Sequence, residues 1–426
     1  MTSLNRPSQP VPSSAPSLSL SPSPSDTPPV DPDRARRRFF ALSLVILLPL
    51  VGGVLWSAAE SGDKEPDPDS LYRYLAIFSE TLNLVRQTYV EPTEMGTLLA
   101  GAMEGSTDAL DSFSIYLPSA VPADQEDQLI PGARHAGLVI LKERGVAYVA
   151  GVEAGSPAVT ADVQSGDILS RIGGRPTRQM PVWEINRELV PVDGRELEIE
   201  VVRRGETKTL KLKLAPSEPP APSLETVQGH PLLRIPRIDS ASVEAVRSLL
   251  SRAAGEGAAK LLIDLRGISG GNPDAAFALA GLFAEGDLGT LKEKEAVERT
   301  FASTGAVAFR GDLVLLVDGF TTGAAEIVAA VLHQKAKAKL VGVPTFGWAG
   351  ERSRIELGNG ARLYLTTAFF AGPDGKPLSQ RLTPDLLVDD FSRRFEEREK
   401  PLSELILERA IRFLNGEPEL VEKKAA

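Results

Sequence analysis

Residues 313–348 restrict the fold of this chain more than any other part of its sequence. Residues 313–317 (LVLLV) are an apolar run typical of a buried strand, and they end in a turn of small residues. Small and aliphatic residues from Glu326 onward predict a helix, and a second apolar strand ends at the turn Thr345-Phe346-Gly347. Strands alternating with helices are typical of an α/β domain with a central sheet.

The same alternation continues through residues 224–415, which we expect to form one α/β core. Further strands are expected at residues 232–238, 260–266 and 361–369, and helices at residues 243–250, 274–283 and 402–414. Ser240 or Ser242 is the expected cap of the first of these helices, because a serine hydroxyl accepts a hydrogen bond from a free backbone N–H. The Pro-rich residues 215–223 predict a linker before the core, and residues 416–426 a tail.

The first 59 residues predict a membrane anchor. Residues 1–38 are rich in Pro and Ser and end in a cluster of arginines, so we expect a disordered cytoplasmic tail. Residues 39–59 are uncharged and mostly aliphatic, and about twenty such residues span a bilayer as a transmembrane helix. Arginines before this run and acidic residues after it place the main domains outside the cytoplasm. The alternative is a cleaved signal peptide that ends at Ser57-Ala58-Ala59.

Two further regions lie between the predicted anchor and the core. Residues 70–131 carry apolar side chains at helical spacing, such as Leu71, Leu75 and Phe78, and predict a helical N-terminal region. Residues 132–214 predict a β-rich domain of short strands, with a hairpin turn at Gly173-Gly174 and one short helix at residues 181–190.

The motifs in this order resemble the C-terminal processing peptidases, also called tail-specific proteases. The resemblance covers residues 70–415 and rests on LDSFSIYL (110–117), LLIDLRGISGG (261–271), GAAEIVAAVL (323–332) and VGVPTFG (341–347). The family reads close to Leu-Asp-Pro-His-Ser-x-Tyr-Leu at the first of these. The resemblance implies an α/β (α+β) serine peptidase core with an inserted PDZ domain at residues 132–214.

The resemblance also implies a catalytic site whose working side chains are absent from this chain. The family's peptidases cut with a Ser–Lys dyad in which the Lys is the general base. The implied position of the Ser is Gly323, that of the Lys is Trp348, and that of a supporting polar residue is Gln334. Backbone N–H groups of an oxyanion hole are implied at Ala324 and at Gly270 or Gly271. Glycine offers no nucleophile, and an indole N–H only donates.

A substitute nucleophile is the alternative to an inactive site. Thr322 lies one position before Gly323, and a threonine hydroxyl acts as a nucleophile when a base is adjacent. A shift of one residue along a turn, however, directs a side chain away from the oxyanion donors. We therefore expect an inactive member of a serine-type peptidase family, with an active endopeptidase that uses Thr322 as the alternative.

The PDZ resemblance implies a peptide-binding site. A PDZ domain binds a peptide as an added strand beside a sheet edge, and a loop of backbone amides holds the terminal carboxylate. The family's loop reads Gly-Φ-Gly-Φ, where Φ is apolar, and the matching residues are His135-Ala136-Gly137-Leu138. Binding of protein C-terminal tails is thereby implied, and a PDZ fold used only for packing is the alternative.

The composition of the chain limits the classes of partner and cofactor that it is expected to bind. The net charge of −10 argues against nucleic acid, since phosphate binding needs a cationic surface. The chain has no cysteine and three scattered histidines, so we expect no metal site and no cofactor. The expected partners are protein or peptide tails, an active peptidase relative or a second copy of the chain, and the membrane. The resulting hypothesis is a membrane-anchored pseudopeptidase that binds rather than cuts.

Overall fold

The computed structural model describes residues 68–153, 155–192, 194–218, 220–294, 296–303, 305–388 and 400–417. The chain divides into two compact units, Met1–Val90 and Glu91–Ala426. The described part of the first unit is the helix α2 (Pro68–Thr88), at the position that the helical spacing predicts. The predicted anchor at residues 39–59 and the tail before it lie outside the described residues. Within the described residues, no helix is long and apolar enough to cross a membrane.

The second unit begins with the segment that the sequence predicts to be helical. It contains α3 (Met95–Asp108), the short strand β1 (Ile115–Leu117) and the single turn α4 (Glu126–Leu129). β1 pairs antiparallel with β17 (Arg362–Ala371) near the other end of the chain. The helical region therefore contributes a strand to the core, which its sequence pattern does not reveal.

A β-rich module follows within the second unit. Its sheet has seven strands in the order β2-β3-β4-β5-β7-β8, with β6 beside β5. The strands are β2 (Arg134–His135), β3 (Leu138–Glu143), β4 (Val146–Val152), β5 (Ile168–Ile172), β6 (Arg175–Pro176), β7 (Glu196–Arg203) and β8 (Glu206–Lys213). The predicted turn Gly173-Gly174 joins β5 to β6, and both glycines have positive φ, as this tight turn requires. The helices of the module are α5 (Pro157–Thr160) and α6 (Val182–Leu189).

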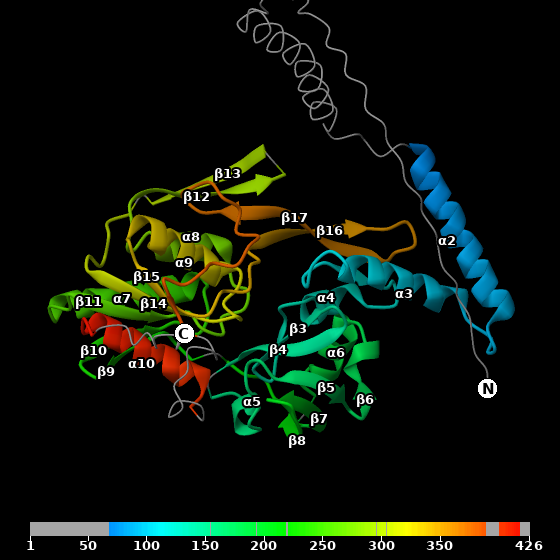
Figure 1. Ribbon diagram of the computed structural model, residues 1–426, viewed down its shortest axis with the longest axis horizontal. Helices are drawn as coiled ribbons and strands as arrows, with labels where there is room; N and C mark the ends of the chain where they lie inside the picture. The colour runs from blue at the N-terminus through cyan, green and yellow to red at the C-terminus, as the bar shows by residue number, and fades with distance from the viewer. Residues whose placement is uncertain are drawn as a thin grey trace, which may run out of the picture. The chain divides into compact units, whose positions relative to one another are not determined.

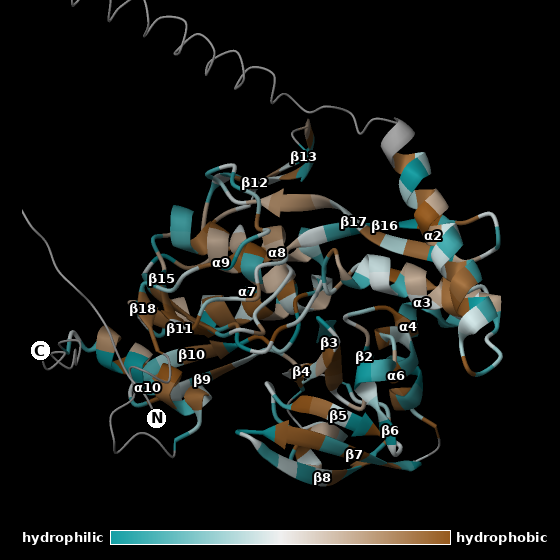
Figure 2. Ribbon diagram, turned by 45° about the vertical axis from the view of Figure 1, so that its right-hand side comes forward, coloured by the Kyte–Doolittle hydropathy of each residue, from teal (hydrophilic) through white to brown (hydrophobic). Residues whose placement is uncertain are grey.

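The core contains a six-stranded sheet in the order β18-β15-β14-β11-β10-β9, parallel except for β9. Its strands are β9 (Ser223–Val227), β10 (His230–Arg234), β11 (Lys260–Asp264), β14 (Asp312–Val317), β15 (Lys339–Gly342) and β18 (Leu386–Leu387). β11 and β14 read as continuous apolar runs because both of their faces are buried, and Figure 2 shows β10 and β11 in brown.

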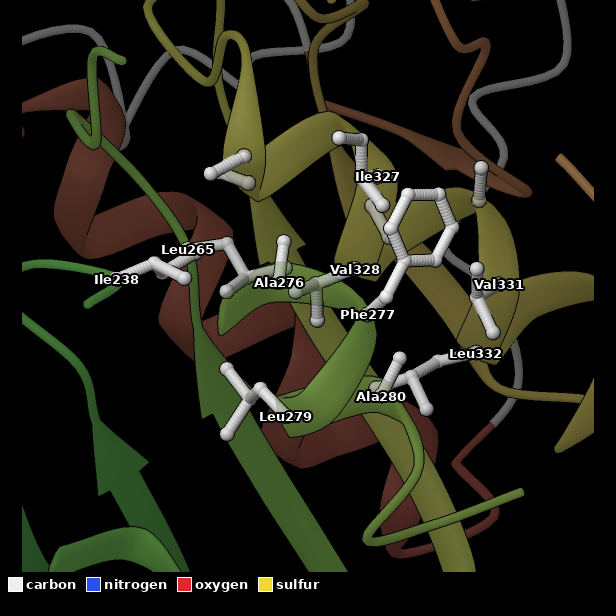
Figure 3. Close-up of a cluster of buried hydrophobic side chains, with 14 of the residues drawn as sticks. Ile238, Leu265, Ala276, Phe277, Leu279, Ala280, Ile327, Val328, Val331 and Leu332 are labelled. Carbon is white, nitrogen blue, oxygen red and sulfur yellow. The ribbon is translucent and has the colours of Figure 1, made fainter. Parts of the chain in front are cut away.

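Helices cover both faces of this sheet. They are α7 (Ser240–Gly255), α8 (Pro273–Ala280), α9 (Ala324–Lys335) and α10 (Leu402–Leu414). Side chains of α7, α8 and α9 share one apolar cluster with the sheet, and those of α10 form another on the opposite face. Figure 3 shows Phe277 and Ala280 of α8 beside Val331 and Leu332 of α9. The cap of α7 is Asp239, which accepts from the Ser242 N–H at 2.8 Å, so the predicted caps Ser240 and Ser242 are wrong and both lie inside the helix.

A second sheet completes the core. Its five strands follow the order β1-β17-β12-β13, and β16 (Gly350–Glu356) also pairs with β17. β12 (Gly286–Glu293) and β13 (Ala296–Ser303) were not predicted from the sequence, and neither was β16. Figure 1 shows α8 and α9 between this sheet and the six-stranded sheet. The turn from β14 into α9, which holds the candidate site, is thus fixed on both sides.

Candidate functional site

The turn at Gly323 has a backbone geometry that few residues tolerate. Gly323 lies between β14 and α9 with φ of +64° and ψ of −121°. Residues with a side chain are strained at such positive φ values, whereas glycine adopts them freely. A Cβ atom at this position would also lie 3.2 Å from the Gly270 Cα. The chain therefore keeps a sharp strand-to-helix turn but places no side chain at its tip.

Main-chain groups of two neighbouring turns close around this tip. The Gly323 N–H donates to the Trp348 carbonyl at 2.8 Å, and the Ala324 N–H donates to the Gly270 carbonyl at 3.2 Å. A Cβ atom on Gly271 would come within 2.8 Å of the Ala324 Cβ, so this turn is in close contact with the start of α9. The structure thus brings Gly323, Trp348, Ala324 and the Gly270-Gly271 turn together. Gln334 is the implied position that lies elsewhere. The implied oxyanion donor at Ala324 is already bonded within the chain.

The Glu326 carboxylate joins α9 to the turn that follows β15. It is fully buried and accepts from the Thr345 hydroxyl at 2.5 Å and the Gly347 N–H at 2.7 Å. It also accepts from the Trp348 N–H at 2.9 Å and the Gly323 N–H at 3.2 Å. Burial raises the pKa of Glu326 to about 7, while these four donors favour its charged form. Its role is to hold the two turns together at the start of α9, where Glu326 is the third helical residue.

Trp348, at the position that the resemblance implies for a general base, is a packed residue. Its side chain is 8% exposed and stacks on Phe113, with 3.8 Å between the ring centroids and 13° between the planes. The indole N–H donates to the Thr366 hydroxyl at 3.2 Å. Val139 and Leu141 of β3 belong to the same apolar cluster. Trp348 therefore links the core to the β-rich module by packing.

Sequence reasoning did not identify Phe113 as part of the site. Phe113 stands at the place where the family's motif has His, two residues after Asp111. At the positions that the resemblance implies for this His and for the Lys, the chain has two aromatic residues, and this coincidence is the signal that the sequence offers. Without the structure, nothing showed that positions so far apart in the chain meet.

The side chains of the remaining candidate catalytic residues form hydrogen bonds to other parts of the fold. The Thr322 hydroxyl is fully buried and donates to the Trp348 carbonyl at 2.9 Å. The hydroxyl of its neighbour Thr321 is also fully buried and donates to the Leu265 carbonyl at 3.0 Å. Gln334 is exposed near the C-terminal end of α9, where its side-chain oxygen accepts from the Asp374 N–H at 2.9 Å. The structure therefore does not bring Gln334 to the turn at Gly323.

The predicted carboxylate loop is a tight hairpin turn between β2 and β3. His135 pairs with Leu138, and the two residues between them, Ala136 and Gly137, have φ of +51° and +83°. His135 is 4% exposed, and its Nε2 lies 2.6 Å from the Gln128 carbonyl, to which it donates. Burial lowers the pKa of His135, so the ring is neutral at pH 7. Contacts within the chain therefore bury the four predicted peptide-binding residues.

The β-rich module is fixed to the core next to the Gly270-Gly271 turn. Arg134 of β2 donates to the Ser269 carbonyl at 3.0 Å and forms an ion pair with Glu153 at 3.0 Å. Gly151 lies so close to the core that a Cβ atom there would be 2.8 Å from the Gly267 carbonyl oxygen. The Arg134 hydrogen bond to Ser269 therefore joins the module to the core, whereas its ion pair with Glu153 lies within the module.

One cleft of about 900 Å³ opens beside Trp348. Phe346, Trp348 and Phe369 supply aromatic surface, and the loop at residues 108–114 and the β3–β4 turn supply polar groups. A concave site with an aromatic wall and a few polar groups suits an extended peptide segment. Among the described residues, no group of three or more His, Asp or Glu side chains is placed to hold a metal ion.

Comparisons with known proteins agree with this architecture. Residues 231–388 match the pattern of peptidase family S41. The carboxy-terminal-processing protease of Bartonella bacilliformis is 25% identical over 328 residues, which cover 75% of this chain and 76% of the relative. The carboxy-terminal processing protease CtpA of Bacillus subtilis is 23% identical over 301 residues, which cover 68% of this chain and 64% of the relative. Residues 231–388 therefore carry the pattern of peptidase family S41, and the chain is similar to a C-terminal processing protease over 75% of its length.

A solved structure supports the same fold. The photosystem II D1 C-terminal processing protease superimposes with a TM-score of 0.60 at 19% identity, covering 78% of this chain and 96% of that one. The mixed α/β fold of the S41 peptidases is therefore present over most of the chain.

Proposed function

We propose that this chain is a non-catalytic S41 homologue that binds protein tails instead of cutting them. The observation that carries the proposal is the pair of replacements at the catalytic turn. Gly323 offers no nucleophile, and Trp348 fills the place of the base with a stacked ring. Acyl transfer to a Ser–Lys dyad needs both a hydroxyl and an amine within hydrogen-bond reach.

No neighbouring group supplies the missing chemistry. Thr322 already donates its hydroxyl proton to the Trp348 carbonyl, and Glu326 accepts four hydrogen bonds. The nearest lysines along α9 begin with Lys335, at the last position of this helix of 12 residues. At 1.5 Å of rise per residue, Lys335 lies roughly 16 Å from the turn. No lysine of α9 therefore reaches a hydroxyl of the turn. The Asp318 carboxylate lies 3.1 Å from the Thr321 hydroxyl, which also donates to the Leu265 carbonyl at 3.0 Å.

The proposed binding role rests on two features, the cleft beside Trp348 and the β-rich module. The cleft of about 900 Å³ lies beside Trp348, and the β-rich module resembles a PDZ domain, a class that binds protein C-termini. The ligand that fits is an unstructured protein terminus with apolar residues. The membrane anchor at residues 39–59 is part of the proposal and rests on the sequence alone. It would hold the binding domains outside the cytoplasm.

Labelling with a fluorophosphonate probe tests the non-catalytic assignment. Such probes phosphonylate activated hydroxyls with loss of fluoride, so the full-length chain is expected to remain unlabelled by intact-mass spectrometry. A Thr322→Ala variant is the matched control and should likewise gain no mass from the probe. An adduct at Thr321 or Thr322 that disappears in the matching alanine variant would show an active site and overturn the proposal.

A further inference from the structure

Residues 126–131 lie against the part of the β-rich module that would receive a peptide. Three successive main-chain carbonyls of this segment are held by two side chains of the module. His135 donates to the Gln128 carbonyl at 2.6 Å, and the Asn186 amide donates to the Leu129 and Ile130 carbonyls, each at 3.1 Å. Capture of consecutive carbonyls is how a protein holds a bound peptide, and here the peptide belongs to the chain itself.

An apolar contact accompanies these hydrogen bonds. Leu129 is 1% exposed and shares an apolar cluster with Val182 of α6 and with Leu117 of β1. Leu129 thus occupies an apolar site on α6, next to the turn between β2 and β3. In a PDZ-type complex, the last side chain of the ligand enters an apolar site beside the loop that holds its carboxylate.

Two hydrogen-bonding features at the same place have no partner among the described residues and could bind an external chain. The Asn186 Oδ1 is buried and has no hydrogen-bond partner. Residues 140–143 of β3 pair with β4 on one side and have no strand partner on the other among the described strands. A peptide strand would supply N–H groups to both, which residues 126–131 do not.

We propose that residues 126–131 are an internal ligand, and that a protein tail with an apolar last residue and a free carboxylate takes their place. The proposal deepens the proposed function and rests on the binding role assigned there. For each donor of His135 and Asn186, a carboxylate oxygen is a stronger acceptor than a neutral carbonyl. Leu129 marks the position of the tail's last side chain.

The contacts of residues 126–131 with the core determine how readily this segment leaves its site on the module. Glu126 at its start accepts from Arg354 at 2.9 Å and from the Tyr364 hydroxyl at 2.5 Å, and it pairs with Arg362 at 2.8 Å. These partners lie on β16 and β17 of the core. Binding of a tail to the module is therefore coupled to release of the segment from the core.

The test uses the full-length chain and a fluorescein-labelled peptide that ends in Ala-Leu-Leu with a free carboxylate. Leu129→Ala weakens the internal ligand, and Ile115→Ala is the matched control, since it removes buried carbon from the same cluster without altering the segment. Fluorescence anisotropy should show binding to Leu129→Ala about tenfold tighter than to the parent and to Ile115→Ala. The reason is that apparent affinity scales with the fraction of molecules whose site is open. The amidated peptide should bind more weakly to all three.

A second pair of variants keeps the test valid if Leu129→Ala does not fold. Glu126→Gln weakens the anchor, whereas Glu356→Gln removes an exposed carboxylate that pairs with the same Arg354. Only the first should tighten binding of the peptide. Hydrogen exchange adds a direct readout, because the peptide should increase exchange of residues 126–131 in the parent.

Two results would overturn the proposal that residues 126–131 are an internal ligand. One is equal peptide affinity within each matched pair, and the other is peptide binding with unchanged exchange of residues 126–131. Neither result would contradict the proposed binding of protein tails. If the peptide binds no variant, the inference and the binding role both fall. The non-catalytic assignment does not depend on either result, since it is tested by labelling at Thr322.

Discussion

Replacement of Trp348 by alanine measures how much the packing of this side chain stabilises the fold. The side chain is 8% exposed, stacks on Phe113 at 3.8 Å and donates to Thr366 at 3.2 Å. Truncation of a buried Trp to Ala costs about 3–5 kcal/mol, of which the lost ring pair accounts for about 0.5–1.5 kcal/mol. We therefore expect the free energy of unfolding to fall by about 4 kcal/mol.

Trp183→Ala is the matched control. Trp183 is only half-buried, and its indole N–H donates to Glu104 at 3.3 Å, outside the cluster around Trp348. Its loss should cost about 1–2 kcal/mol. Urea unfolding followed by far-ultraviolet circular dichroism compares the two variants. A Trp348→Ala cost below about 1 kcal/mol, or one equal to the control, would refute the reasoning, because neither fits a buried, stacked ring.

Three further predictions follow from the same contacts. Gly323→Ser should lower stability by about 1–3 kcal/mol in thermal or urea unfolding, because a side chain at φ of +64° is strained, and it should not restore cleavage by itself. Burial raises the pKa of Glu326 to about 7, so its contribution to stability is greatest below pH 4.5 and is lost as the pH rises through 7. Urea unfolding across this range should show that slope in the parent and not in Glu326→Gln. The Arg354 hydrogen bond lowers the pKa of Glu126 to about 2, so its contribution is present above pH 4.5 and is lost as the pH falls toward 2. Glu126→Gln should flatten that acid limb of the stability profile, and an unchanged limb would contradict the pairing.

The sequence predicts the buried strands of the core well, and the antiparallel sheet poorly. β11 and β14 are continuous apolar runs, since both of their faces are covered, and this pattern is visible without a structure. β16 reads GERSRIE and is mostly exposed, so its pattern is that of a loop. Its pairing with β17 comes from tertiary context, which local pattern does not report.

The site shows the same division. The positions of Gly323 and Trp348 follow from motif order, and the structure places them at adjoining turns. The pairing of Phe113 with Trp348 and the contacts of Asn186 with Leu129 join residues far apart in the chain. Such contacts depend on how the module and the core pack, and no local spacing encodes them. Gln334 is the implied position of a supporting polar residue, but it lies near the end of α9 that is remote from the turn at Gly323.

Hydrolysis of an unfolded protein with an apolar C-terminal tail tests the central claim most directly. The parent chain is assayed beside a Gly323→Ser/Trp348→Lys double variant, with cleavage followed by mass spectrometry of the products. We predict that the parent leaves the substrate intact over a time in which an active relative cuts it, and that any cleavage requires the restored Ser and Lys. Cleavage by the parent, abolished by Thr322→Ala, would contradict the account.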